Sequence, residues 1–355
     1  MQEIIVSKIE SGQSLRKMLL KYFSKAPSSF IYKMLRKKNI TLNGKKAQGK
    51  EMLKEGDVIK FFLSGETIEK FTNKECLMDG SFVEGFPVIP VIYENQDILL
   101  LNKPVGVLSQ KSKESDVSMV EFITSYLLKT GAISKELLQS FRPSICNRLD
   151  RNTSGLITAG KTVAGLQELN KMFRQRRIDK YYLCVVIGEL KESITIKGYL
   201  QKDEGINRVT IVKEDDLKSK EIDIRAVGNI EEDTELQKDK KGDYIETQYA
   251  PLKVSNGLTL LRVKLITGKA HQIRAHLASC EHPLLGDYKY GDRAINDKFK
   301  KKYGLESQLL HSHSLIFPET KGAFASLSGR GFEAKPPKLF IEIVEGEGLA
   351  ELFYL

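Results

Sequence analysis

One loop of this 355-residue sequence places an acidic side chain between two arginines. Asp150 lies between Arg148 and Arg151, and a Thr-Ser-Gly turn at 153–155 leads from it into a short apolar stretch. Nearby opposite charges favour the ionised form of a carboxyl group, so we expect Asp150 to be an anion near neutral pH. Such a carboxylate can act as a nucleophile or as a general base. An isolated loop aspartate can equally hold its own turn through hydrogen bonds, so the loop alone leaves both interpretations open.

The residues around Asp150 resemble a known enzyme signature. The stretch Asn147-Arg148-Leu149-Asp150-Arg151-Asn152-Thr153-Ser154-Gly155-Leu156 is similar to the His-Arg-Leu-Asp-x-x-Thr-Ser-Gly-Leu element of the RluA family of pseudouridine synthases. The resemblance implies that Asp150 is the catalytic aspartate. Asn147 stands where the family usually has a histidine, and this departure concerns position 147 alone.

A second segment, Lys180–Gly188, reads as a strand in which Tyr182, Cys184 and Val186 share one face. It resembles the Lys-x-Tyr-x-Ala-x-Val-x-Gly strand of the same family. The resemblance implies that Tyr182 stacks on the target base and takes part in moving its C5 proton. Without the resemblance, Tyr182 would be interpreted as a core aromatic residue with its hydroxyl at the edge.

A third segment, residues 267–278, reads as a turn entering a helix, with His271 and Arg274 on a common face. It is similar to the family's Thr-Gly-Arg-x-His-Gln-Ile-Arg-x-His-Leu, with Lys269 in place of the first arginine. The resemblance implies that Arg274 pairs with the catalytic aspartate, whereas a helix-anchoring surface arginine is the alternative. Two later matches, 283–291 and 310–317, are interpreted as structural parts that frame the cleft.

Pseudouridine formation breaks the N1–C1′ bond of uridine, rotates the uracil and closes a C5–C1′ bond. The reaction needs no cofactor and no metal, and we expect neither. The carboxylate either attacks the sugar or removes its C2′ proton, and the sequence leaves this choice open. Extruding the nucleotide costs a few kcal/mol. The resemblance implies that Arg148 fills the space that the flipped base vacates.

The basic surplus of the chain lies in its first 66 residues. The formal net charge is +10, and residues 1–66 carry 14 Lys or Arg against 6 Asp or Glu. Within Ser14–Lys38 the apolar spacing predicts two short helices, and the second places Lys33, Arg36 and Lys37 on one exposed face. The pair Asn43-Gly44 predicts a tight hairpin between short strands.

This order of elements resembles the small RNA-binding domain named after bacterial ribosomal protein S-four. The resemblance extends from Ser14-Leu15-Arg16-Lys17 through Ile40–Lys45 to Glu55–Ile59. It implies that the chain binds RNA through Arg16 and the three basic residues of the second helix. A charged, solvated helix face on a structural cap is the alternative interpretation.

The expected architecture is α+β, with a small α/β RNA-binding domain at 1–66, a linker at 67–87 and a catalytic domain at 88–355. The catalytic domain should contain a mixed, largely antiparallel sheet with the Asp150 loop in a central cleft.

Within the catalytic domain, alternating and helical patterns predict paired strands at Val88–Tyr93 and Ile98–Asn102 and a helix at Ser118–Lys129. The charged stretch Lys213–Asp243 reads as a solvent-exposed loop.

Several classes of protein do not fit the sequence. The cysteines lack metal or disulfide spacing, and we interpret them as free thiols: Cys76, Cys146, Cys184 and Cys280. A Gly-x-Gly-x-x-Gly pattern and a Walker loop are absent, which argues against a methyltransferase or a helicase. The apolar runs are too short to span a membrane. We expect a cytoplasmic monomer whose partner is RNA.

The sequence therefore predicts an RNA pseudouridine synthase, and the S-four-like domain favours large-subunit ribosomal RNA as its substrate. Transfer RNA is the alternative substrate. A catalytically silent RNA-binding protein and a base-excising glycosylase are alternative classes; the glycosylase would release free base, whereas an isomerase leaves the mass of the RNA unchanged.

Overall fold

The structure is a computed structural model that describes residues 2–72, 86–203, 208–213 and 242–350. The chain divides into two compact units. Unit 1 comprises Met1–Leu101, Val107–Arg148 and Ile157–Gln175, and unit 2 comprises Asn102–Gly106, Leu149–Leu156 and Arg176–Leu355. The Asp150 loop and the segments around Tyr182 and Arg274 all belong to unit 2.

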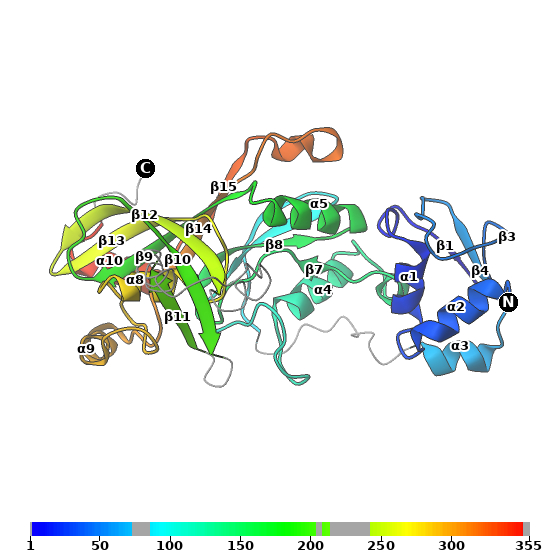
Figure 1. The fold of residues 1–355 in the computed structure, drawn as a ribbon, viewed down its shortest axis with the longest axis horizontal. Coiled ribbons are helices and arrows are strands. Elements are labelled where there is room, and N and C mark those ends of the chain that lie inside the picture. The colour runs from blue at the N-terminus through cyan, green and yellow to red at the C-terminus, as the bar shows by residue number, and fades with distance from the viewer. Residues whose placement is uncertain (1, 73–85, 204–207, 214–241, 351–355) are drawn as a thin grey trace, which may run out of the picture. The chain divides into compact units, whose positions relative to one another are not determined.

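The N-terminal part of unit 1 combines a small antiparallel sheet with short helices (Figure 1). The strand order is β1-β4-β2-β3. In chain order the elements are β1 (Gln2–Ile5), α1 (Leu15–Tyr22), α2 (Ser28–Arg36), β2 (Ile40–Leu42), β3 (Lys45–Lys46), β4 (Val58–Phe61) and α3 (Gly65–Phe71). Asn43 and Gly44 connect β2 to β3 with φ angles of 51° and 72°, which confirms the expected tight hairpin.

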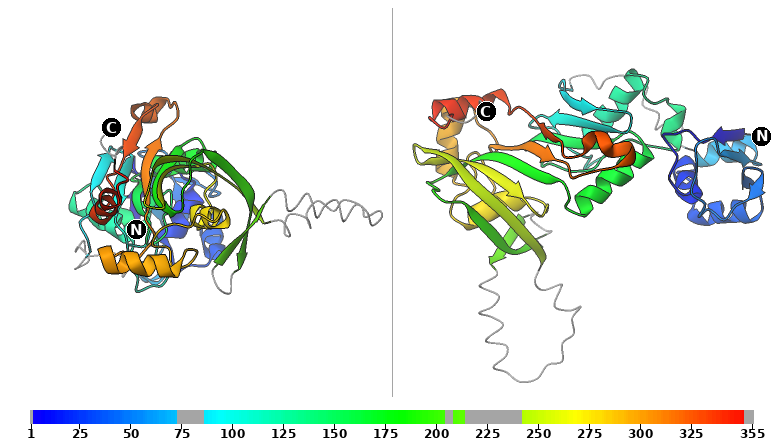
Figure 2. Two further views of the ribbon diagram at one scale, coloured as in Figure 1. Left: turned by 90° about the vertical axis from the view of Figure 1, so that its left-hand side faces the viewer. Right: turned by 90° about the horizontal axis from the view of Figure 1, so that it is seen from above.

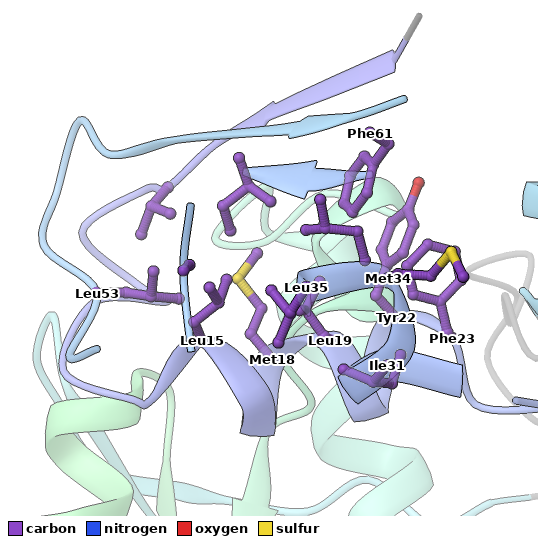
Figure 3. Packing of buried hydrophobic residues seen from close by; sticks show 14 of the residues in the cluster. Leu15, Met18, Leu19, Tyr22, Phe23, Ile31, Met34, Leu35, Leu53 and Phe61 are labelled. Carbon is purple, nitrogen blue, oxygen red and sulfur yellow. The ribbon is translucent and has the colours of Figure 1, made fainter. Parts of the chain in front are cut away.

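The apolar faces of α1 and α2 form the core of this part (Figure 3). Leu15 and Leu19 of α1 are buried at helical spacing, and the ring of Tyr22 stacks on Phe61 with 5.3 Å between ring centroids. In α2, Ile31 and Met34 are buried. Burying one face of each helix leaves the opposite face to solvent, and there the basic residues of α2 are exposed.

Helix α3 corrects the predicted linker, which was placed at 67–87. Ser64 caps α3, which runs through Gly65–Phe71, and its Ile68 is buried in the N-terminal core. One buried side chain in a polar heptapeptide gives no readable period, which is why the sequence did not indicate a helix here. Residues 73–85 lie outside the described part, and the predicted domain boundaries otherwise stay a prediction.

The larger sheet follows the order β11-β10-β12-β13-β9-β14-β8-β6-β5, with β15 on β14 and β7 on β8 (Figure 1). Its strands are β5 (Val91–Glu94), β6 (Ile98–Lys103), β7 (Ser144–Ile145), β8 (Ser154–Gly160), β9 (Asp179–Ile187), β10 (Ile194–Asp203), β11 (Arg208–Lys213), β12 (Asp243–Ser255), β13 (Leu258–Leu265), β14 (Leu310–Ile316) and β15 (Gly331–Glu333). Strands β8 and β14 are parallel, whereas the pairs from β11 to β14 are antiparallel. The mixed, largely antiparallel sheet of an α+β fold is confirmed.

The described helices of this region are α4 (Met119–Lys129), α5 (Val163–Arg174), α8 (Gln272–Ser279), α9 (Arg293–Tyr303) and α10 (Lys338–Gly346), with short 3-10 turns at Glu136–Gln139 and Gly322–Leu327. Ser118 and Glu121 form a capping box at the start of α4, so the helix predicted at Ser118–Lys129 is confirmed. The predicted pair of strands corresponds to β5 and β6. Most of the loop predicted at Lys213–Asp243 lies outside the described residues.

Helix α8 packs on one face of the sheet in unit 2 (Figure 2). Its Ile273 and Leu277 belong to the same buried cluster as Tyr182 and Cys184 of β9. The predicted common face of β9 is therefore confirmed, and α8 lies over it. This packing brings the segment of Arg274 to the face of the sheet that carries Tyr182.

Close backbone contact joins β8 to β14. Ser312 pairs with Gly155, which has a φ of 112°, and a β-carbon at Gly155 would lie 2.2 Å from the carbonyl oxygen of Ser312. Only glycine avoids that overlap and reaches this φ without strain. Gly155 thus fixes the strand that begins directly after the Asp150 turn.

Candidate active site

The backbone of the Asp150 turn is fastened to residues at the end of β6. Lys103 Nζ donates hydrogen bonds to the carbonyl oxygens of Pro104 and Arg151, each at 3.0 Å, and its side chain is fully buried. Gly106 and Arg151 exchange two further hydrogen bonds, each 3.0 Å long. Burial lowers the pKa of Lys103 to about 7, and the negative charge of Asp150 opposes that shift. The turn is therefore held directly after Asp150, whose side chain stays 27% exposed.

Arg274 of α8 bridges two carboxylates. Its Nη1 lies 3.1 Å from Asp150 Oδ2, while Nε and Nη2 donate to Asp287 at 2.7 and 2.9 Å. The Asp287 side chain is fully buried, and burial alone would raise its pKa. The hydrogen bonds and charge of Arg274, with the backbone N–H groups of Lys289 and Tyr290, instead hold the pKa of Asp287 below its usual range. This bidentate pair orients the guanidinium so that its remaining edge faces Asp150.

His271 lies at the start of α8 beside the same carboxylate. Its Nε2 is 3.9 Å from Asp150 Oδ2, and its Nδ1 is hydrogen-bonded to the Tyr290 hydroxyl at 2.9 Å. Burial lowers the pKa of His271, the charge of Arg274 acts in the same direction, and Asp150 opposes both. The ring is therefore mainly neutral at neutral pH, which leaves Arg274 as the permanent cation beside Asp150.

Tyr182 projects from β9 on the face covered by α8 and is 6% exposed. Burial raises the pKa of its hydroxyl to about 12, and the charge of Asp150 adds to this effect. The phenol therefore stays protonated at neutral pH. Since Tyr182 lies within electrostatic reach of Asp150, the structure brings three of the predicted residues together: Asp150, Tyr182 and Arg274.

The cation paired with Asp150 comes from a distant part of the sequence. It is Arg274, 124 positions away, which is the pairing that the resemblance implied. Of the two flanking arginines, Arg151 donates to the Gly106 carbonyl and Arg148 is exposed. Asn147, which replaces the family's histidine, accepts hydrogen bonds from the backbone and hydroxyl groups of Thr158 at 2.7 and 3.0 Å.

Sequence reasoning missed two residues of this site. Asp287 lies in the segment that we interpreted as structural, and Lys103 was not singled out. A polar residue inside the apolar end of a strand, as in Leu-Leu-Leu-Asn-Lys at 99–103, is the one signal that could have pointed to Lys103. The basic residues of α2 and Arg16 belong to unit 1, and their side chains are exposed.

The comparisons with known proteins define the class. The family model for RNA pseudouridylate synthase matches residues 97–279, a span that contains Asp150, Tyr182 and Arg274. The chain belongs to this family. It is therefore an isomerase that acts on RNA and converts uridine to pseudouridine.

Individual relatives are similar over most of their length. A protein of Vibrio parahaemolyticus named ribosomal large subunit pseudouridine synthase C is 27% identical, over 86% of this chain and 85% of that protein. A protein of the same name from Rickettsia bellii is 29% identical, over 92% and 95%. An uncharacterised RNA pseudouridine synthase of Mycoplasma capricolum is 28% identical, over 84% and 88%.

Solved structures add evidence on the fold. The structure of human RNA pseudouridylate synthase domain containing 4 superposes with a TM-score of 0.50 at 20% identity, covering 72% of this chain and 91% of that one.

Among the residues that the structure describes, no helix is both long and apolar enough to cross a membrane.

Proposed function

We propose that this chain isomerises specific uridines of large-subunit ribosomal RNA, with Asp150 as the reacting group. The observation that carries the proposal is the set of hydrogen bonds made by the Arg274 guanidinium, which we call the Arg274 fork. One edge of the guanidinium binds buried Asp287, and the remaining edge faces the partly exposed carboxylate of Asp150. A carboxylate held in this way can either attack C1′ of the sugar or remove the C2′ proton.

The remaining roles follow from the positions of the side chains. Tyr182 offers an aromatic ring and a protonated hydroxyl close to Asp150, which suit stacking on an extruded uracil and hydrogen bonding to it. Arg148 is exposed two residues before Asp150 and would occupy the space left by the flipped base. In the isomerisation of uridine to pseudouridine, the N1–C1′ bond breaks and a C5–C1′ bond forms, while C5 loses its proton and N1 gains one.

The substrate class rests on the relatives. Several similar proteins carry names that specify the ribosomal large subunit, and they align with 86–92% of this chain. We infer that this chain acts on the same substrate, and transfer RNA is the competing substrate. We also infer that the enzyme is a monomer and works in the cytoplasm.

The substrate proposal is tested by mapping pseudouridines in cells that lack the gene. Carbodiimide-dependent primer extension should show that specific large-subunit sites disappear, and that wild type restores them whereas Asp150→Asn does not. The same RNA preparations contain transfer RNA. Loss of transfer-RNA sites with intact ribosomal sites would overturn the ribosomal assignment.

We propose that the S-four-like segment supplies sequence-independent affinity for RNA. Lys33 and Arg36 of α2 and Lys37 at its C-terminal end are exposed. The Arg16 guanidinium lies 4.9 Å from the centre of the half-exposed Tyr32 ring. Phosphate-binding cations next to an exposed aromatic ring are typical of single-stranded RNA surfaces.

Replacing Lys33, Arg36 and Lys37 together by glutamine should weaken RNA affinity, because counterion release at each phosphate contact is lost. The slope of log affinity against log salt should fall by about 2 for three contacts. The single-turnover rate at saturating RNA should stay within about threefold of wild type. An unchanged salt slope, with an unchanged melting temperature, would contradict the proposed role of this face.

A further inference from the structure

Lys180 is a basic residue of the site region that the roles above leave unused. It lies at the start of β9, two residues before Tyr182, so both side chains leave the strand on the same face. Two residues of strand span about 6.8 Å, which places the Lys180 backbone roughly one nucleotide's length from that of Tyr182. The Lys180 side chain is partly buried, in contrast to the exposed lysines of α2.

The Lys180 ammonium group lacks a protein partner among the described residues. The neighbouring carboxylate, Asp179, leaves the strand on the opposite face and pairs with Lys264 at 2.9 Å. The Nζ atom of Lys180 instead lies against the backbone of Gly268, where an added β-carbon would be only 3.3 Å away. Gly268 lies in the loop that leads into α8, so the amine lies between the strand of Tyr182 and the segment of Arg274.

Burial and a neighbouring cation both disfavour the charged form of Lys180. Burial lowers the pKa of Lys180 to about 8, the charge of Arg176 contributes to that shift, and the charge of Asp179 opposes it. Arg176 is exposed three residues before β9 begins and has a φ of 55°. A partly buried cation beside a second cation is costly unless an anion completes the site. The arrangement therefore fits a negatively charged ligand better than it fits a purely structural role.

We propose that Lys180, together with Arg176, binds a backbone phosphate of the RNA strand next to the target uridine. The proposal rests on the uridine-isomerising site described above. The target uridine reaches Tyr182 and Asp150, and the phosphate belongs to the adjacent nucleotide. The single negative charge of the phosphate reduces the repulsion between the two cations. Gly268 has no side chain, which leaves space for the amine of Lys180. Lys180 is thus a substrate-binding residue that sets the register of the RNA in the site.

The test compares Lys180→Met with Lys180→Arg, using a large-subunit ribosomal RNA transcript that the wild type modifies. Loss of one charge-assisted hydrogen bond should weaken RNA binding by about 10- to 100-fold in Lys180→Met. The slope of log affinity against log salt should fall by about 0.7, the value for one contact to a single strand. Lys180→Arg keeps the charge and should restore both the affinity and the slope.

The matched control is Lys197→Met. Lys197 is exposed on β10, next to Ile196, which belongs to the Tyr182 cluster, so the lysine leaves the sheet on the other face. This variant should change RNA affinity by less than about twofold, since its charge is far from the proposed phosphate path.

Two results would overturn the phosphate site. One is a Lys180→Met protein with wild-type affinity and salt slope. The other is a loss of activity that follows a lowered melting temperature and is not rescued by Lys180→Arg, since that pattern indicates a structural lysine. If the wild type modifies no large-subunit ribosomal RNA transcript, the proposed substrate is wrong, whereas the RNA affinity and salt slope of the Lys180 variants still test the phosphate site.

Discussion

Replacing Asp150 by asparagine should slow pseudouridine formation by at least about 10⁴-fold, the scale on which enzymes lose rate when a reacting group is removed. Asparagine keeps the size of the side chain but can neither attack the sugar as an anion nor accept a proton as a base. Because Asp150 is 27% exposed and its turn is held by backbone contacts to Lys103 and Gly106, the fold should tolerate the change.

The measurement for Asp150→Asn is tritium release from RNA labelled at C5 of uracil, made under single-turnover conditions. RNA affinity and melting temperature should match wild type, since only the reacting group has changed. Asp297→Asn is the matched control, because Asp297 is exposed on α9 and hydrogen-bonded to Tyr288. A rate for Asp150→Asn within about tenfold of wild type would contradict the assigned role.

Removing the Arg274 fork should damage both stability and catalysis. In Arg274→Met the fully buried carboxylate of Asp287 loses its charged partner, and such a loss costs about 3–5 kcal/mol of the free energy of unfolding. Asp150 loses its cation at the same time, so pseudouridine formation should also fall below detection.

Arg274→Lys separates these two effects. One ammonium group keeps the charge but cannot make the bidentate contact to Asp287 and also reach Asp150. The variant should recover part of the lost stability and still react about 100-fold more slowly, because a displaced reacting group costs about that factor.

Urea unfolding and single-turnover rates measure the two effects for each variant. Arg262→Met is the control, since Arg262 is exposed and stacks 4.2 Å from the centre of the Tyr181 ring. An Arg274→Lys enzyme with the wild-type rate would show that the fork geometry is not needed for catalysis.

Local patterns predicted much of the fold. The period of α4, the alternation of β9 and the Asn43-Gly44 turn depend on residues close together in the sequence, and the structure has all three. Helix α3 was missed because a single buried residue, Ile68, gives no period.

The partners within the site could not be predicted from local patterns. The bond between Arg274 and Asp150 depends on how α8 packs over β9, and a resemblance to known sequences was the only early sign of it. Asp287 orients Arg274 and Lys103 holds the Asp150 turn because both are buried and contact another segment of the chain. Neither burial nor such a contact can be predicted from the residues adjacent to them in the sequence.

We infer that a carboxylate held by Arg274 isomerises uridine within an intact RNA chain. The most direct measurement incubates the purified protein with a large-subunit ribosomal RNA transcript, then determines the intact mass of the RNA and its nucleosides after digestion. We expect pseudouridine in place of uridine at an unchanged mass with wild type, and no pseudouridine with Asp150→Asn. Free uracil with abasic RNA, or pseudouridine formed by Asp150→Asn, would contradict the claim.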